Sequence, residues 1–182
     1  MMMNSLRKYL LPIVIAMVFV GVATASILTN GNKNTTHEGG VKWITFEELN
    51  KLQKKNPRKV VFDVYTDWCG WCKKMDKSTF ADPTVGKFAN EKFYAVKLNA
   101  ESKKVIKYQG REMTEQELAA SWRVTGYPTT VYLDEKMNLI EPRSGYLDVN
   151  QFMLVLKFYG GDHHKSQTIE QFAQTQQPIQ AR

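Results

Sequence analysis

Two cysteines, Cys69 and Cys72, are the most reactive residues of this 182-residue chain, which contains no others. They stand three positions apart in "DWCGWCKK", where a helical pattern begins. Unpaired N–H groups and the helix dipole favour negative charge at a helix N-terminus, so Cys69 should ionise more readily than a cysteine in open solution. We expect its sulfur to be the exposed one that exchanges with a partner disulfide. Cys72, one turn further in, would then resolve the mixed disulfide.

Other uses of a cysteine pair fit the sequence less well. A disulfide that closes so short a loop stabilises the fold little. A zinc site needs four ligands, and the other soft candidates are His37 and the adjacent pair His163 and His164. A c-type haem needs histidine directly after the second cysteine, where Lys73 stands. We therefore expect a redox pair that works without a metal or a separate cofactor.

A carboxylate and a lysine upstream and downstream of the pair could assist it. Asp63 lies in "VVFDVY", six residues before Cys69. Burial would raise its pKa and let it exchange a proton with Cys72, unless it faces solvent on the polar side of a strand. Lys97, in "AVKLN", is either the charge partner of Asp63 on the next strand or a solvated lysine. Pro128, in "GYPTT", marks a turn or a strand start, with a trans bond the commoner form by spacing alone.

Helix caps and apolar runs outline the elements that position these residues. The run 59–65 is typical of a strand buried on both faces, and further strands are expected at 93–98, 129–133 and 139–145. Capping signals predict helices at 46–55, 69–80, from 83 onward, 115–122 and 149–159. The alternation of strands and helices, followed by two successive strands and a last helix, predicts a mixed sheet with helices on both faces.

The segments W-C-x-x-C, "VVFDVY", "KLN" and "GYPTT" together resemble the thioredoxin superfamily in order and spacing, over residues 41–160. The stretch "YTDWCGWCKKMDKSTFADPTV" is most similar to the C-terminal thioredoxin-like domain of the transmembrane thiol:disulfide interchange reductase and to exported thioredoxin-like proteins. The resemblance implies a thioredoxin-like three-layer α/β/α sandwich with a mixed central sheet.

The resemblance also implies roles for single residues. Pro128 would be cis and pack against the cysteine pair, and the backbone of Tyr127 would pair with a substrate strand. Asp63 would be the buried proton acceptor, with Lys97 as its neighbour. Trp68 would shield the site and flank the substrate groove.

This chain departs from the family pattern at two places. Gly70 and Trp71, which complete the expected substrate-binding set, stand where the common thioredoxin has Gly-Pro. Because that dipeptide tunes the reduction potential, no value is carried over from the family. An extra segment, 101–113, is expected to form a hairpin around Gln109 and Gly110.

The N-terminus carries the features of an export signal. Arg7 and Lys8 precede a long apolar run, and Ala23-Thr24-Ala25 follows it. Residues 1–25 are expected to be a signal peptide or an uncleaved membrane anchor, and either would place the rest across the membrane. Residues 26–40 are interpreted as a polar linker, 41–160 as one domain and 161–182 as a loosely held polar tail.

The expected function is an extracytoplasmic, monomeric thiol-disulfide oxidoreductase that reduces disulfides of exported proteins. The resemblance implies that a separate membrane partner supplies the electrons. Two alternatives remain: an oxidase or isomerase on the same scaffold, and a binding module whose thiols are inert. The net charge of +7 is dispersed without a long basic run, so nucleic-acid binding is not expected.

Overall fold

The computed structural model describes residues 39–176. The predicted signal peptide or anchor, 1–25, lies outside these residues, as do positions 26–38 of the predicted linker and the C-terminal segment 177–182. Within residues 39–176, no helix has the length and apolar character needed to cross a membrane.

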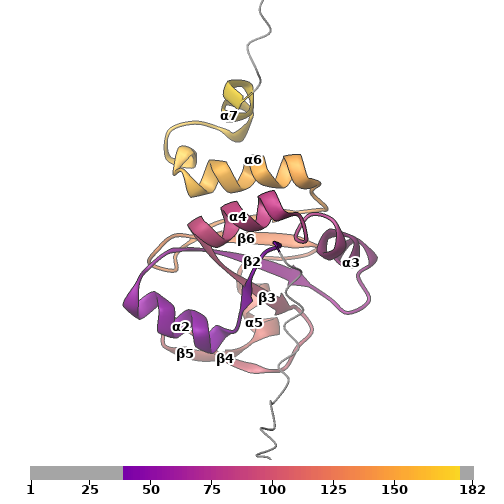
Figure 1. Cartoon of the computed structure of the whole chain (residues 1–182). Coiled ribbons are helices and arrows are strands. Elements are labelled where there is room, and N and C mark those ends of the chain that lie inside the picture. Colours follow the sequence, from indigo (N-terminus) through magenta and orange to yellow (C-terminus); the bar gives the residue numbers. More distant parts are fainter. Residues whose placement is uncertain (1–38, 177–182) are drawn as a thin grey trace, which may run out of the picture. The chain divides into compact units, whose positions relative to one another are not determined.

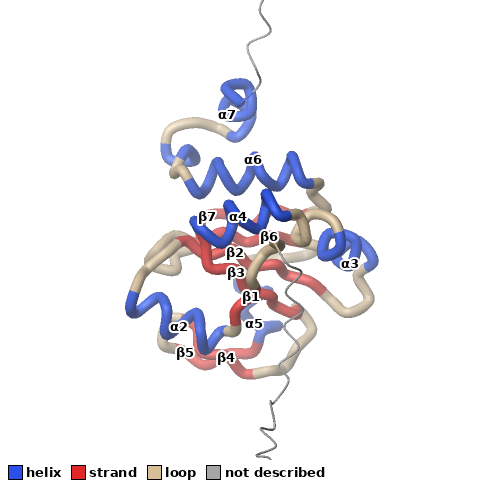
Figure 2. Tube along the Cα trace, in the orientation of Figure 1, coloured by secondary structure: helices blue, strands red, loops and turns tan. Residues whose placement is uncertain are grey.

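A mixed five-stranded sheet forms the centre of the described region (Figures 1 and 2). Its strand order is β1-β3-β2-β6-β7. The parallel strands are β1 (Trp43–Ile44), β3 (Phe93–Asn99) and β2 (Lys59–Tyr65). The antiparallel strands β6 (Thr129–Leu133) and β7 (Leu139–Ser144) extend the sheet beyond β2. The predicted mixed sheet is confirmed, and β2 is its central strand.

The helices begin where the capping signals predict. Oxygen atoms of Thr45, Asp82, Thr114 and Asp148 each accept a hydrogen bond from a backbone N–H in the first turn that follows. Because the side chain satisfies a donor that has no partner within the helix, these four positions fix the helix starts. The α-helices of the described region are α2 (Phe46–Lys55), α3 (Gly70–Lys77), α4 (Pro83–Lys92), α5 (Glu115–Ser121), α6 (Val149–Gly160) and α7 (Ile169–Gln176).

Helices cover both faces of the sheet, as Figure 2 shows. Side chains of α3, α4, α6 and α7 pack on the face to which Val61 of β2 points. Helices α2 and α5 pack on the other face, with Val60, Phe62 and Val64. Side chains alternate along a strand, so Asp63 points to the same face as Val61 and therefore towards α3. The predicted three-layer α/β/α architecture is confirmed.

The extra segment forms the hairpin that its sequence predicts. Strands β4 (Val105–Tyr108) and β5 (Arg111–Thr114) pair antiparallel. Gln109 and Gly110 connect them with φ values of 47° and 81°, the left-handed conformation typical of a two-residue hairpin turn. Ile106 and the ring of Tyr108 are buried in the core beside α2 and α5. The hairpin is therefore an integral part of that layer.

The prediction of a loosely held tail is wrong for residues 161–176. A short 3-10 helix, η1 (His163–Lys165), and α7 follow α6. Phe172 of α7 is only 3% exposed, and its ring lies 5.6 Å from that of Phe158. Ile169 and Phe172, three positions apart, give α7 an apolar side, which the glutamine-rich composition concealed.

Gly86→Ala is expected to lower the free energy of unfolding by about 3 kcal/mol, the upper end of the usual cost of overpacking. A Cβ on Gly86 would lie 2.1 Å from the carbonyl oxygen of Gly39 and 2.4 Å from the carbonyl carbon of Gly40, so α4 would have to move. Urea unfolding followed by circular dichroism measures the change. Gly126→Ala is the control, because an added Cβ there has nothing within 4 Å. Equal destabilisation by the two substitutions would contradict this packing.

Candidate active site

The cysteine pair opens α3 as a disulfide. The two sulfur atoms are 2.05 Å apart and the Cα atoms 5.3 Å apart. Cys69 is the N-cap residue, and its Sγ accepts a hydrogen bond from the backbone N–H of Cys72 at 3.0 Å. No acidic residue stands in the first turn of the helix. A negative charge on the Cys69 sulfur of the reduced protein would therefore be stabilised by a direct donor and by the helix dipole.

The expectation that Cys69 is the exposed cysteine is not met in this disulfide form. Cys69 is 4% exposed and Cys72 is 3% exposed. As the capping side chain, Cys69 turns its sulfur over the first turn of α3 instead of away from it. The neighbouring side chains Trp68 and Trp71 are 67% and 57% exposed. Indole rings, and not sulfur, therefore dominate the accessible surface at this end of α3.

Asp63 is buried, and an ion cluster joins it to the helix that carries the cysteines. Asp63 is 1% exposed and pairs in register with Lys97 on β3. The Lys97 ammonium lies 2.8 Å from Oδ2 of Asp63 and 2.5 Å from Oδ1 of Asp76. Among the described residues, Oδ1 of Asp63 has no hydrogen-bond partner. Oδ1 of Asp63 is therefore available to exchange a proton.

Burial and charge act in opposite directions on this cluster. Burial raises the pKa of Asp63, and the charge and hydrogen bond of Lys97 offset only part of that effect. Asp76 adds a negative charge that raises the pKa of Asp63 further. For Lys97, burial opposes the charged form, but the two carboxylates outweigh it and raise the pKa of the ammonium. Lys97 therefore stays charged, while Asp63 is the group that can change protonation state.

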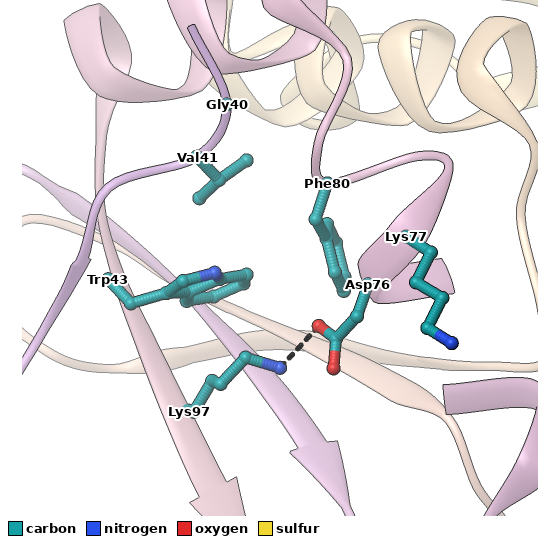
Figure 3. A pocket seen from close by; sticks show the side chains of 7 residues that line it. All are labelled: Gly40, Val41, Trp43, Asp76, Lys77, Phe80 and Lys97. Carbon is teal, nitrogen blue, oxygen red and sulfur yellow. Dashed lines mark hydrogen bonds and ion pairs between the residues drawn. The ribbon is translucent and has the colours of Figure 1, made fainter. Parts of the chain in front are cut away.

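A cavity of about 130 Å³ gives access to one side of the cluster. Figure 3 shows the Lys97 ammonium pointing to the Asp76 carboxylate at this cavity, beneath the ring of Trp43. The ammonium lies 4.8 Å from the centre of the Trp43 ring and 5.7 Å from that of Phe80. Asp63 does not line the cavity, so water that enters it meets Lys97 and Asp76 first. The lining residues are Gly40, Val41, Trp43, Asp76, Lys77, Phe80 and Lys97.

Trp68 is held from two sides on the rim of the site. Its ring meets that of Tyr127 edge to face, with centroids 5.9 Å apart. Its Nε1–H donates to Oε1 of Glu101 at 3.0 Å. Glu101 begins the extra segment that leads into the β4–β5 hairpin. That segment therefore holds the indole of the residue that directly precedes Cys69.

Pro128 and Gly70 occupy the same end of the sheet as the cysteines. The Tyr127–Pro128 peptide bond is cis, and Pro128 is buried directly before β6. Thr129, the next residue, pairs with Val64 near the end of β2, from which the chain continues to Cys69. Gly70 is the exposed first residue of α3, where a Cβ would meet nothing within 4 Å. The substrate-binding roles of both residues remain predictions.

Four residues of this site are not predicted from the sequence. Asp76 has the clearest signal, because it follows Cys72 by four positions and so lies on the same helical face. Lys74 follows Trp71 by three positions, so their contact is also local to α3. Tyr146, which contacts Trp71, and Glu101, which contacts Trp68, come to the site only through the fold. No motif in the sequence connects them.

Comparison with known proteins places these features in a family. A model of the thioredoxin-like domain matches residues 45–160. The thiol:disulfide interchange protein DsbD of Haemophilus influenzae is 30% identical over 115 residues, which are 61% of this chain and 18% of that protein. DsbD of Actinobacillus pleuropneumoniae is 33% identical over 106 residues, 57% of this chain and 16% of that protein. The chain thus spans less than a fifth of the length of these relatives.

Solved structures agree with the fold. A thioredoxin-fold protein from Helicobacter pylori superposes with a TM-score of 0.56 at 22% identity, covering 66% of this chain and 80% of its own. A thioredoxin from Thermus thermophilus superposes with a TM-score of 0.53 at 22% identity, covering 71% of this chain and 99% of its own. Both superpositions support the thioredoxin-like fold over the matched part of this chain.

Asp63→Asn is expected to stabilise the protein at neutral pH. Because burial raises the pKa of Asp63 above its ordinary value of 3.8, the folded state binds more protons than the unfolded state between these two pKa values. Stability of the wild type is therefore lost as pH rises through that window. The advantage of the variant should be absent below the ordinary value and grow above it. Urea midpoints of both proteins, measured between about pH 3 and about pH 8, give the difference.

Asp134→Asn is a control of opposite sign. Burial opposes the charge on Asp134, but hydrogen bonds from Asn138 and Lys136 outweigh it and lower the pKa of this carboxyl. Its stabilising effect is present at neutral pH and lost as pH falls, so the substitution should cost stability only above the lowered pKa. A loss of stability in Asp63→Asn that is the same at every pH would contradict the buried, raised state of Asp63.

Proposed function

The chain belongs to the thioredoxin-like domain family, and from this premise we propose that it is an extracytoplasmic reductase of protein disulfides that works through Cys69 and Cys72. One observation carries the proposal: Sγ of Cys69 accepts the N–H of Cys72 at the start of α3, on the side of the sheet where Asp63 is buried. An inert cross-link would need neither a sulfur that caps the helix nor a buried carboxylate on the same side of the sheet.

The reaction begins with the reduced pair. The Cys69 thiolate attacks one sulfur of the substrate disulfide, the substrate S–S bond breaks, and the first substrate sulfur leaves as a thiolate that takes up a proton. Cys72 then loses its proton and attacks the Cys69 sulfur, which releases the second substrate sulfur. Two electrons pass to the substrate, and the protein is left with the Cys69–Cys72 disulfide.

Asp63 is proposed to receive the proton of Cys72 in the second step. A carboxylate whose pKa is raised by burial can take a proton nearer to neutrality and return it when the disulfide is reduced again. Lys97 stays charged beside it, while Asp76 and the cavity give a route to water. Lys97 and Asp76 therefore assist through Asp63.

We propose the location and the electron supply from the predicted leader and from the relatives. The leader in residues 1–25 supports an extracytoplasmic site of action, in the periplasm, with the domain either released or tethered. The relatives named thiol:disulfide interchange proteins support exchange with protein partners. Reducing equivalents would come from a separate membrane donor, and exported proteins with disulfides would be the substrates of a monomeric domain.

Cys69→Ser should abolish the protein's catalysis of insulin disulfide reduction by dithiothreitol, because the attacking sulfur is gone. Cys72→Ser should retain the first step and accumulate a mixed disulfide with the substrate, visible on a non-reducing gel. The pair of variants is a matched control, since each removes one thiol. Insulin reduction at the wild-type rate by Cys69→Ser would refute the proposal, and so would a mixed disulfide that forms only in that variant.

The reduction potential of the pair decides the direction of electron flow. Equilibration with glutathione should give a value near that of thioredoxin, roughly −270 mV, if the protein is a reductase. A value near roughly −120 mV would instead indicate an oxidase. This measurement distinguishes the two activities, which share the same residues.

A further inference from the structure

A lysine near the cysteine pair in α3 lies over two aromatic rings that contact each other. The Lys74 ammonium lies 4.7 Å from the centre of the Trp71 ring and 4.9 Å from that of Tyr146. The two rings are 5.4 Å apart and inclined by 47°. Ser78, at the end of α3, holds the Tyr146 ring in place, because Oγ of Ser78 lies 3.3 Å from the Tyr146 hydroxyl. The ammonium thus has a defined place on an otherwise exposed surface.

This ammonium is not neutralised within residues 39–176. Lys97 and Lys59 each form ion pairs with two carboxylates, whereas no carboxylate of the described region lies within 4.0 Å of the Lys74 ammonium. Attraction to the ring faces holds a cation in position without cancelling its charge. Lys74 therefore presents a positive charge two residues after Cys72 in the chain. This charge lies next to the exposed ring of Trp71, one of the two residues between the cysteines.

The part of the site around Trp68 carries negative charge. Glu101 is exposed and bound to the Trp68 indole through one oxygen, and exposed Asp67 adjoins the same tryptophan in sequence. Among the described residues neither carboxylate forms an ion pair within 4.0 Å. A substrate segment that approaches the disulfide thus meets an acidic rim at Trp68 and a basic one at Trp71.

We propose that Lys74, positioned by Trp71 and Tyr146, selects substrate segments that carry an aspartate or glutamate beside the cystine. The inference rests on the proposed reductase function and adds the chemical class of its substrates. An incoming carboxylate would supply the ion pair that Lys74 lacks, while the acidic rim at Trp68 would repel it and so fix the direction of the segment. Rim charges act chiefly on encounter and orientation, so the effect should be modest and sensitive to salt.

Two cystine peptides of the same sequence, one with glutamate and one with glutamine beside the cysteines, test the inference. Wild-type protein should reduce the glutamate peptide with a kcat/KM about two- to fivefold higher at low salt, the effect of one exposed ion pair. Lys74→Gln should remove this preference, mainly through KM, and Lys74→Arg should keep it because the cation over the rings is restored. Near 1 M salt, where the screening length falls to about 3 Å, the wild-type preference should shrink.

Lys73→Gln is the matched control. It removes the same charge from the adjacent exposed position of α3, where the described residues provide no aromatic ring beneath the ammonium. It should retain most of the preference for the glutamate peptide. Equal reduction of both peptides by the wild type, or equal loss of preference in Lys73→Gln and Lys74→Gln, would overturn the role of Lys74 and leave the reductase intact. Failure of the wild type to reduce either peptide would overturn the proposed function and this inference together.

Discussion

The hydrogen bond from the backbone N–H of Cys72 to Sγ of Cys69 is the interaction on which the rest of the site depends. It makes a cysteine the capping residue of α3, a place where side chains with polar oxygen atoms are the usual choice. The surrounding fold holds this cap in place. Strand β2, buried along nearly its whole length, leads the chain to the cap, and Met75 anchors the helix in the core with no exposed surface.

Two groups of side chains with different chemistry lie near the disulfide, one buried and charged and the other exposed and aromatic. Inside, Asp63, Lys97 and Asp76 form a charged cluster in which one ammonium is shared by two carboxylates. Outside, Trp68 and Trp71 are exposed aromatic rings, each held by a second aromatic side chain. The buried cluster can accept and release a proton without contacting a substrate. The rings of Trp68 and Trp71 can contact a substrate without disturbing that cluster.

Most of the fold is predictable from the sequence, since capping residues and apolar runs are local signals that the core does not override. Burial of Asp63 is predictable for the same reason, because its neighbours in β2 are apolar. The pairing of Asp63 with Lys97 is one of two possibilities until strand register is known. Contacts between Trp68 and Glu101 and between Trp71 and Tyr146 join segments far apart in the chain. Helix α7 packs through two apolar side chains, Ile169 and Phe172, in a polar stretch. Such features need the tertiary structure.

The pKa of Cys69 in the reduced protein is the most direct test of this account. Thiolate absorbance near 240 nm, followed across pH in Cys72→Ser, isolates the single sulfur. Capping of α3 by the Cys69 sulfur predicts a midpoint at least about one unit below the ordinary cysteine value of roughly 8.5. A midpoint at or above that ordinary value would show that the N–H groups of α3 do not stabilise the anion, and would contradict the assignment of Cys69 as the attacking sulfur.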